Sequence, residues 1–555
     1  MKKLTFFFFF PFFILFFTLP AFAITYYTAK TGSDSNSCVQ AQNTATPKLT
    51  IASGMGCLAG GGDTLYIRTG VYAETIIFGS TSTLKGSLWA NPLTIASYPA
   101  ETAIVRPTSG YAAVRVISNT TEYVVFDRLE IDATNMTNQG VRLEGSRGRI
   151  RISNCNIYGS PDNNILIVNA SGSNEIIGND IHHNIETEGV GEPYGHGIYI
   201  ESSSNLIERN VIHHNTGYGV HVYNGSGTRA NNNIIRYNIG HNNATSSFAP
   251  GSAAFLIGSG DNNVLHNNIA YGQPVGFMAG FNASTNGKIY NNVAYNNSRD
   301  GIQIRSSSTS VVIKNNILQD NNTSAGGYAN INNFSSSGTT FSNNRCFSTG
   351  GTSNCSSTTD PLFVNAAANN FALQASSPAI NAGVAIAGYP YNGAAPDQGA
   401  HETFTCTSVL PDTAGDNTIV ITCENNLAPP LLPATGCLGF SAKKNDVNNA
   451  ITDCSRTADN KITLTLTNSY INTDVGKWSY VTASGNVTDS MKIGGTLNQR
   501  LNAVTDQIPT NQIGSSAPVL TQVSGRFSVG GTEASADRKL QNNTELAVPP
   551  KPCFN

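Results

Sequence analysis

The sequence predicts an all-β solenoid, a chain wound into coils whose short strands stack as parallel sheets. Two observations predict this fold: an Asn-led phrase recurs seven times between Cys155 and Cys346, and short runs alternate aliphatic with variable residues. Successive copies of the phrase are 31, 23, 34, 24, 24 and 29 residues apart, as expected for coils of which some carry loop insertions. The copies begin at Asn179, Asn210, Asn233, Asn267, Asn291, Asn315 and Asn344.

The alternating runs are predicted strands of one sheet. Alternation with a period of two places the aliphatic residues inward and the variable residues on one outer face. Stacked coils then bury a continuous core that a single coil cannot bury. The runs are residues 141–143, 165–167, 198–200, 220–222, 255–257, 277–279 and 302–304.

The recurring Asn is expected to lie at a bend between strands. Asn tolerates unusual backbone angles, and its amide can bond to the equivalent Asn one coil away, at about 4.8 Å. We therefore expect a structural ladder of Asn side chains along the solenoid.

Residues 24–402 resemble the right-handed parallel β-helix proteins of the pectin-lyase-like superfamily. The resemblance rests on opening segments at 26–34 and 61–68 and closing segments at 360–363, 377–383 and 398–402. It implies a right-handed parallel β-helix, capped at the N-terminus by a short helix and the first strands. It does not imply one activity, because such solenoids include lyases, hydrolases, epimerases and non-catalytic adhesins.

Residues 1–23 have the pattern of a bacterial signal peptide. Two lysines precede a Phe-rich apolar run, and a small-x-small site ends at Ala23. The run is shorter than the roughly 20 residues of a spanning helix. We therefore expect a secreted or cell-surface protein that does not insert into the membrane after cleavage.

The formal net charge of -3 over 555 residues gives no electrostatic signature of nucleic-acid binding. An uncharged glycan partner is compatible with it. The oligomeric state cannot be assigned from the sequence.

Ten Cys residues in an exported chain favour disulfides over metal ligation. We expect Cys38 to pair with Cys57 in the cap and Cys346 with Cys355 in the last coil. Cys155 stands where other coils have Asn, and we expect a buried thiol. The pairing of the other five is left open: Cys406, Cys423, Cys437, Cys454 and Cys553.

The coil phrase stops after Glu402, and separated alternating runs follow. These runs predict a small β-sandwich over residues 403–495, which resembles the immunoglobulin-like repeats of bacterial surface proteins. Residues 496–555 are predicted to be a flexible polar tail.

Unequal connections indicate where a site lies. Sixteen residues separate Ile181 from Gly197 and nineteen separate Ile235 from Ala254, whereas Ile212 and Gly219 are only seven apart. Insertions at 185–194 and 239–252 are predicted to form walls above a floor made by the coil of His221.

The outward positions on that floor and beside it are polar and aromatic. The strand spacing places Tyr199 beside His221, Glu201 beside Tyr223, and His196 near Tyr218. The predicted catalytic residues are His196, Tyr199, Glu201 and His221. The predicted substrate-binding residues are Arg142, Glu144, Tyr218, Tyr223, Gln303 and Arg305.

Two reactions suit these residues. In a polysaccharide lyase, His221 or His196 would be the base and Tyr199 or Tyr223 the acid. Calcium-dependent superfamily members use clustered Asp residues, and no such cluster is predicted on this face, so we expect no cofactor.

In a glycoside hydrolase, two carboxyl groups are needed. Glu144 and Glu201 would be about 9.6 Å apart, near the upper limit for inversion. The loop carboxylates Glu186, Glu188 and Glu192 are other possible partners.

The alternatives stay open. The rings can form structural cross-coil stacks, or a sugar platform without catalysis. His182-His183 and His213-His214 occupy matching positions, and we interpret them as stacked turn histidines rather than a metal site. The sequence thus predicts a secreted polysaccharide-engaging protein, acting as lyase or hydrolase, with a non-catalytic adhesin or carbohydrate-binding scaffold as the alternative.

Overall fold

The fold is given by a computed structural model of the chain. It describes residues 23–402 with short gaps, and beyond residue 403 it describes only the backbone of strands between 404 and 528. The gaps within the first part fall at 146, 169–170, 186–194, 224–229, 246–250, 325, 375, 390 and 392–393. The predicted signal peptide and the carboxylates Glu186, Glu188 and Glu192 lie outside the described residues.

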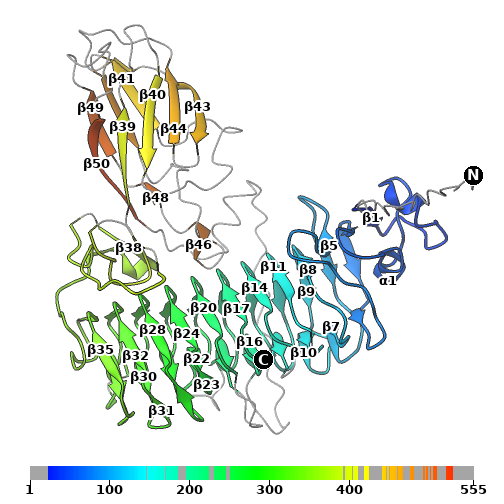
Figure 1. The fold of residues 1–555 in the computed structure, drawn as a ribbon, viewed down its shortest axis with the longest axis horizontal. Coiled ribbons are helices and arrows are strands. Elements are labelled where there is room, and N and C mark those ends of the chain that lie inside the picture. The colour runs from blue at the N-terminus through cyan, green and yellow to red at the C-terminus, as the bar shows by residue number, and fades with distance from the viewer. Residues whose placement is uncertain are drawn as a thin grey trace, which may run out of the picture.

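Three long parallel sheets of 12, 11 and 10 strands build the solenoid, and each complete coil contributes one short strand to each of them (Figure 1). Sheet A contains β1 (Thr25–Thr28), β2 (Thr64–Ile67), β5 (Leu93–Ser97), β8 (Val124–Asp127), β11 (Ile150–Ser153), β14 (Glu175–Ile177), β17 (Leu206–Glu208), β20 (Ile234–Arg236), β24 (Val264–His266), β28 (Lys288–Tyr290), β32 (Val312–Lys314) and β35 (Thr340–Ser342). Sheet B contains β3 (Gly70–Tyr72), β6 (Ala103–Val105), β9 (Leu129–Asp132), β12 (Asn156–Tyr158), β15 (Asp180–His182), β18 (Val211–His213), β21 (Ile239–His241), β25 (Ile269–Tyr271), β29 (Val293–Tyr295), β33 (Ile317–Gln319) and β36 (Arg345–Phe347). Sheet C contains β4 (Ile76–Phe78), β7 (Ala112–Val116), β10 (Gln139–Leu143), β13 (Ile165–Ile167), β16 (Ile198–Ile200), β19 (Val220–Val222), β22 (Ala253–Ile257), β26 (Val275–Ala279), β30 (Ile302–Ile304) and β34 (Ile331–Asn333). A small fourth sheet pairs β23 (Gly260–Asp261), β27 (Ser284–Thr285) and β31 (Ser308–Thr309).

The predicted solenoid and its sheet C register are confirmed. Tyr199 pairs with His221, and the aliphatic residues on either side of each are fully buried. Burying a Val, Leu or Ile side chain stabilises the fold by about 1.5–3 kcal/mol, and each coil buries such side chains on its inward face. The core is therefore one continuous column of aliphatic and aromatic side chains between the three sheets.

An Asn ladder runs along the bend between sheets A and B. Asn210 Nδ2 donates to Asn238 Oδ1 at 2.9 Å and also to the Ile176 carbonyl at 2.8 Å. The same bonding joins ladder members that are 31, 28, 30, 24, 24 and 28 residues apart. The members are Asn179, Asn210, Asn238, Asn268, Asn292, Asn316 and Asn344.

This ladder corrects the predicted repeat at four of its seven copies. Asn233 belongs to a second ladder, at the entry to sheet A, where it bonds Asn205 and Asn263. The true equivalent of Asn210 is Asn238, so the steps of 23 and 34 in the sequence repeat were a slip between two ladders. The copies predicted at Asn267, Asn291 and Asn315 begin one residue before the ladder members Asn268, Asn292 and Asn316, and these preceding residues have φ angles of 54°, 50° and 58°.

The same slip affects the predicted second wall. Residues 239–241 form strand β21 of sheet B, so they are not part of an insertion. The connection from β21 to β22 is therefore shorter than expected, and residues 246–250 within it lie outside the described part. Of the first wall, only Ile185 is described.

The two ends of the solenoid contain short helices and disulfides. The cap contains α1 (Ile51–Met55) and a 3-10 turn (Gln40–Gln42), and the Cys38–Cys57 disulfide joins them as predicted. The predicted Cys346–Cys355 disulfide closes the last coil, and Cys155 is a buried thiol. After the last coil, β37 (Phe363–Asn365) and β38 (Asn370–Leu373) pair around a 3-10 turn (Ala366–Ala368).

Antiparallel strands follow residue 403. One set orders as β43 (Ile451–Ala458), β44 (Lys461–Leu466), β40 (Thr418–Cys423), β39 (Phe404–Val409), β50 (Leu520–Ser528) and β48 (Arg500–Leu501). Another orders as β42 (Val447–Asn448), β41 (Phe440–Lys444), β45 (Gly476–Tyr480) and β49 (Val504–Ile508), and β46 (Lys492–Ile493) pairs with β47 (Thr496–Leu497). The immunoglobulin-like sandwich and its boundary at residue 495 stay predictions, although β49 and β50 lie in the expected tail. In the described residues no helix has the length and apolarity of a membrane span.

Candidate functional site

Five aromatic rings gather on the outer face of sheet C around β16 and β19. Tyr199 stacks on His221 with ring centroids 4.8 Å apart, as predicted, and Tyr223 stacks on the same His221 at 5.3 Å. His196 lies 5.3 Å from Tyr218, also as predicted. The strands bring residues 22 to 27 positions apart into one cluster because successive coils place equivalent residues side by side.

Hydrogen bonds fix the protonation of the two histidines. The Tyr218 backbone N–H donates to His196 Nδ1 at 3.1 Å, so a neutral His196 carries its proton on Nε2. His196 Nε2 lies 2.9 Å from His221 Nδ1 and donates its proton to that atom. A neutral His221 therefore carries its own proton on Nε2, and this buried atom has no hydrogen-bond partner among the described residues.

Burial keeps both histidines neutral. It lowers the pKa of His196 to about 3 and lowers the pKa of His221 well below its ordinary value. The neutral rings of His196 and His221 expose no outward lone pair, because both Nδ1 atoms accept hydrogen bonds and both Nε2 atoms carry protons. In this arrangement His221 is a hydrogen-bond donor, and the role of base requires the opposite tautomer.

Glu201 follows β16 beside this cluster. Burial raises the pKa of its carboxyl group above 4.5, and the positive charge of Arg142 offsets part of that rise. A carboxylate with a raised pKa is a stronger base than an ordinary one. Glu201 is also only partly buried, so it is more accessible than His221, which is 9% exposed.

Glu144 lies in a different setting. One of its oxygens binds Arg115 Nε at 2.6 Å, and the other binds Arg142 Nε at 2.8 Å. Arg115 and Arg142 both lie over the ring of Tyr111. The carboxylate is thus held by two guanidinium groups.

The predicted binding residues at the other end of sheet C form a separate group. Register places Gln303 three strands beyond His221, about 14 Å away. Its side chain binds buried Asp300 at 2.6 Å, and Arg305 lies over the Phe281 ring. Tyr223 also contacts Phe281, at 5.6 Å between ring centroids. Phe281 thus links the two groups.

Sequence reasoning missed two features of this face. Arg115 pairs in register with Arg142 one coil earlier, and residues 114–116 show the same alternation as 141–143, so the signal was present. Leu256 and Met278, at the outward positions after His221, are fully buried in a small apolar cluster with Tyr218. The outer face of sheet C is therefore apolar between its two polar groups.

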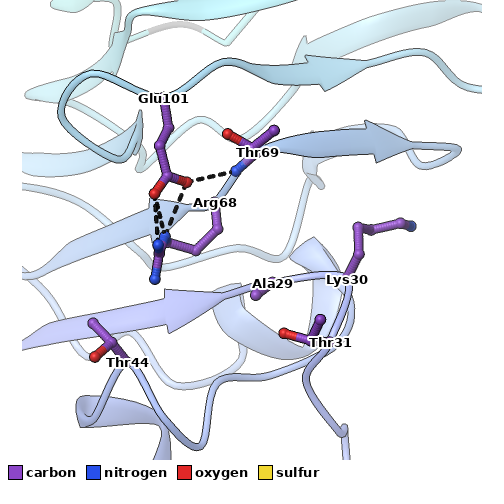
Figure 2. Close-up of a pocket in the computed structure, with 7 residues that line it drawn as sticks. All are labelled: Ala29, Lys30, Thr31, Thr44, Arg68, Thr69 and Glu101. Atoms are coloured by element: carbon purple, nitrogen blue, oxygen red, sulfur yellow. Dashed lines mark hydrogen bonds and ion pairs between the residues drawn. The ribbon is translucent and has the colours of Figure 1, made fainter.

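A shallow depression of about 330 Å³ lies elsewhere, at the first coils (Figure 2). Its only acidic side chain, Glu101, binds Arg68 Nε at 2.8 and 2.9 Å and the Thr69 backbone N–H at 2.8 Å. These opposite charges are satisfied by each other.

A second ring column follows the outer face of sheet B. Tyr158, His182, His213, His241 and Tyr271 stack in order, with ring centroids 4.8 to 5.3 Å apart. The predicted stacking of turn histidines is confirmed.

Acid is expected to destabilise the protein through these buried histidines. Burial lowers the pKa of His241 to about 3 and that of His182 to about 4, from 6.5. Because these pKa values are lower in the folded protein than in the unfolded chain, the protein keeps its full stability above about pH 6.5 and loses stability as the pH falls toward 3. The loss is about 1.4 kcal/mol for each unit by which a pKa is lowered. Melting temperatures across this range should fall less steeply for His241→Tyr, since Tyr fills the next position of the stack. Identical slopes would contradict the assignment.

Comparisons with known proteins address the fold. Residues 108–250 match the family model described as right handed beta helix region. The coils form a right-handed β-helix. Among solved structures, the chain is similar to pectate lyase Pel9A, with a TM-score of 0.52, 18% identity, and coverage of 68% of this chain and 96% of that one. At this identity the similarity establishes the fold alone.

Two further solved structures are similar at lower scores. The GH136 lacto-N-biosidase from Eubacterium ramulus has a TM-score of 0.39 and 14% identity, covering 58% of this chain and 64% of that one. The mannuronan C-5 epimerase AlgE4 A-module from Azotobacter vinelandii has a TM-score of 0.35 and 14% identity, covering 58% and 87%. No curated protein sequence matches the chain.

Proposed function

We propose that this β-helix protein holds a polysaccharide across the outer face of sheet C, over the coil that carries His221. The observation that carries the proposal is the cluster of partly exposed Tyr199, Glu201 and Tyr223 around the buried His196–His221 pair. Aromatic side chains with polar tips suit the mixed apolar and hydroxylated surface of a sugar. The fold is shared with a pectate lyase, whose name indicates a polysaccharide ligand of the kind proposed here.

The reaction that these residues support best is β-elimination on a uronate-containing chain. Glu201 takes the proton from the carbon next to the uronate carboxyl group. The C–H electron pair becomes a C=C bond, the bond to the glycosidic oxygen breaks, and that oxygen takes a proton from the Tyr199 hydroxyl. His221 positions Tyr199 by stacking on its ring.

Hydrolysis by Glu144 and Glu201 is less well supported. Glu144 is bound by two arginines, and Val168, which directly follows β13, lies between the two carboxylates in register. A water-activating base must present a lone pair to water, whereas both oxygens of Glu144 already accept bonds.

A non-catalytic adhesin or carbohydrate-binding scaffold is the second candidate. His221 Nε2 is inaccessible in this structure, and Leu256 and Met278 close the face beside it. A closed surface that binds glycan without cleaving it fits these two observations.

Export is part of the proposal. The signal-like residues 1–23 and two disulfides fit an oxidising extracellular compartment. We assign residues 24–402 to the β-helix, 403–495 to an immunoglobulin-like sandwich and 496–555 to a tail.

The deciding experiment incubates the protein with panels of acidic and neutral polysaccharides. Unsaturated products, new reducing ends and retained binding are measured in parallel. Elimination predicts unsaturated ends that are lost in Tyr199→Phe and kept in Tyr295→Phe, a matched control on sheet B. Reducing ends without unsaturation would favour hydrolysis, and binding without products would favour the scaffold.

A further inference from the structure

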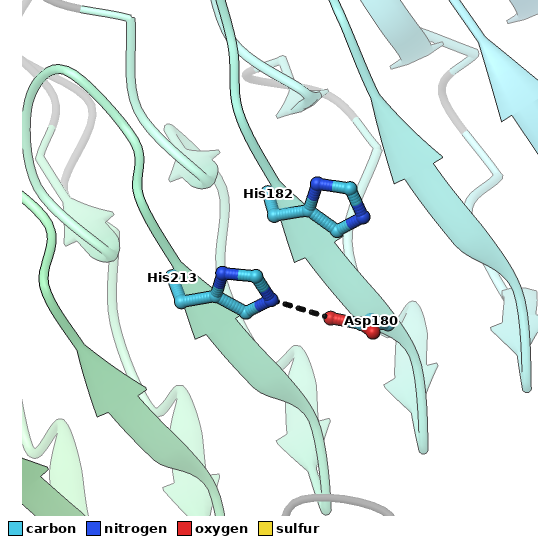
Figure 3. Close-up of side chains that lie close together, drawn as sticks. All are labelled: Asp180, His182 and His213. Carbon is cyan, nitrogen blue, oxygen red and sulfur yellow. Dashed lines mark hydrogen bonds and ion pairs between the residues drawn. The ribbon is translucent and has the colours of Figure 1, made fainter. Parts of the chain in front are cut away.

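The histidines on sheet B form two matched pairs at the turns that follow β15 and β18. His182 and His183 bring their Nδ1 atoms to 2.8 Å, and His213 and His214 bring theirs to 2.7 Å (Figure 3 shows His182 and His213 on adjacent strands). The rings of each pair are nearly perpendicular. His183 and His214 stack on each other across the coils, with centroids 4.9 Å apart.

The opposite ring nitrogens are held by acceptors. His213 Nε2 lies 3.1 Å from Asp180 Oδ1, and His182 Nε2 lies 2.9 Å from Asn156 Oδ1. A carboxylate accepts only, so a neutral His213 carries its proton on Nε2 and keeps a lone pair on Nδ1. This is the arrangement found around metal-ligating histidines, whose second nitrogen donates to a carboxylate or carbonyl.

We propose that each of these pairs binds a divalent transition-metal ion through its two Nδ1 atoms, with Cu²⁺ preferred. The ion displaces the proton that His183 or His214 carries on Nδ1, and that proton moves to Nε2 of the same ring. With metal–nitrogen bonds of 2.0–2.1 Å, two ligands at a right angle lie about 2.9 Å apart and two tetrahedral ligands about 3.4 Å apart. The observed separations match the right angle, which Cu²⁺ and Ni²⁺ adopt in square-planar sites and Zn²⁺ does not.

The spacing between coils sets the stoichiometry. Nitrogens on opposite sides of one ion lie about 4.2 Å apart. The ring centroids of stacked histidines in successive coils are 4.9 Å apart, and because these rings are nearly parallel their equivalent nitrogens have a similar spacing. One ion therefore binds one pair, and a second ion binds more weakly because its like-charged neighbour is close. His183 is exposed and His214 is partly exposed, so both pairs are accessible to ions.

The neutral rings are ready to ligate. Asn156 and Asp180 hold the protons of His182 and His213 on Nε2, so the Nδ1 lone pairs of these two rings face His183 and His214. In the next coil, where Asn242 takes the position of His183 and His214, the buried His241 Nδ1 has no partner in the part of the chain that the structure describes. That coil is an incomplete copy of the same site.

The backbone at this turn position allows ligand-removing and ligand-adding variants that do not strain the fold. His183, His214 and Asn242 have φ angles of 49°, 53° and 50°, so His and Asn exchange there without new backbone strain. His183→Asn with His214→Asn removes one ligand from each pair. Asn242→His completes a third pair with His241.

The test titrates untagged protein with Cu²⁺ or Zn²⁺ against a competing chelator, with electron paramagnetic resonance of the bound Cu²⁺. We expect two Cu²⁺ per chain, weaker Zn²⁺ binding, and at least a tenfold loss of Cu²⁺ affinity in the double variant. Asn242→His should bind one more ion. Cu²⁺ binding that is absent in the natural chain, or unchanged in the double variant, would overturn the proposal, and so would tighter Zn²⁺ than Cu²⁺. The site lies on sheet B and does not depend on the function proposed for sheet C.

Discussion

Asn210→Ala is expected to lower the free energy of unfolding by about 3–5 kcal/mol. Asn210 is fully buried, and its side chain accepts from the Asn179 backbone and amide and donates to Ile176 and Asn238. Truncation leaves these buried groups without partners, at about 1–3 kcal/mol for each unsatisfied group. Denaturant unfolding followed by circular dichroism measures the loss.

Asn282→Ala is the matched control, because Asn282 is exposed on the same solenoid. It should change stability by less than about 0.5 kcal/mol. Equal losses in the two variants would show that the ladder contributes nothing beyond ordinary surface contacts.

Cys155→Asn tests the ladder in the opposite direction. Cys155 already donates its backbone N–H to Asn179 Oδ1, and its sulfur lies 3.7 Å from the Phe126 carbonyl. An Asn amide there would donate to that carbonyl, as Asn179 donates to Ile152. The variant is therefore expected to fold with stability equal to that of the natural chain or higher.

The fold was predictable because each coil repeats one pattern. The alternation of residue types predicted which side chains point inward, and the strand spacing predicted that Tyr199 stacks on His221. Both predictions were possible because they follow from backbone geometry. The ladder register was not fully predictable. Asn233 and Asn238 both border the three-residue strand β20, and only the hydrogen bonds assign each to its own ladder.

The sequence predicted which residues lie together at the site, but it did not predict their hydrogen bonds or protonation. The Nδ1–Nε2 bond between His221 and His196, and the burial of both rings, depend on side-chain directions that a repeat pattern does not contain. The same holds for Glu144, whose pairing with Arg115 involves a coil before those that the repeat defined. Sequence periodicity places residues on a face, and it does not say which of their atoms are already occupied.

Glu201→Gln is expected to reduce polysaccharide cleavage by about 10²–10⁴-fold while binding is retained. Gln keeps the size and hydrogen bonding of Glu201 but cannot accept the proton. In the natural protein, activity should rise with pH as Glu201 ionises, and the midpoint of that rise should lie above 4.5 because burial raises the pKa of the carboxyl group.

The stability of the same variant gives an independent measurement. Because the pKa of Glu201 is raised in the folded protein, its contribution to the free energy of unfolding is fully present below pH 4.5. That contribution is lost as the pH rises through the pKa of the folded state. Glu201→Gln should therefore match the natural chain in acid and exceed it in stability at neutral pH. A variant that gains stability at neutral pH yet cleaves polysaccharide at the natural rate would show that Glu201 is buried as proposed but is not the base. Because His221 and His196 present no outward lone pair in their neutral forms, that result would transfer the search for a base to Tyr199 and Tyr223.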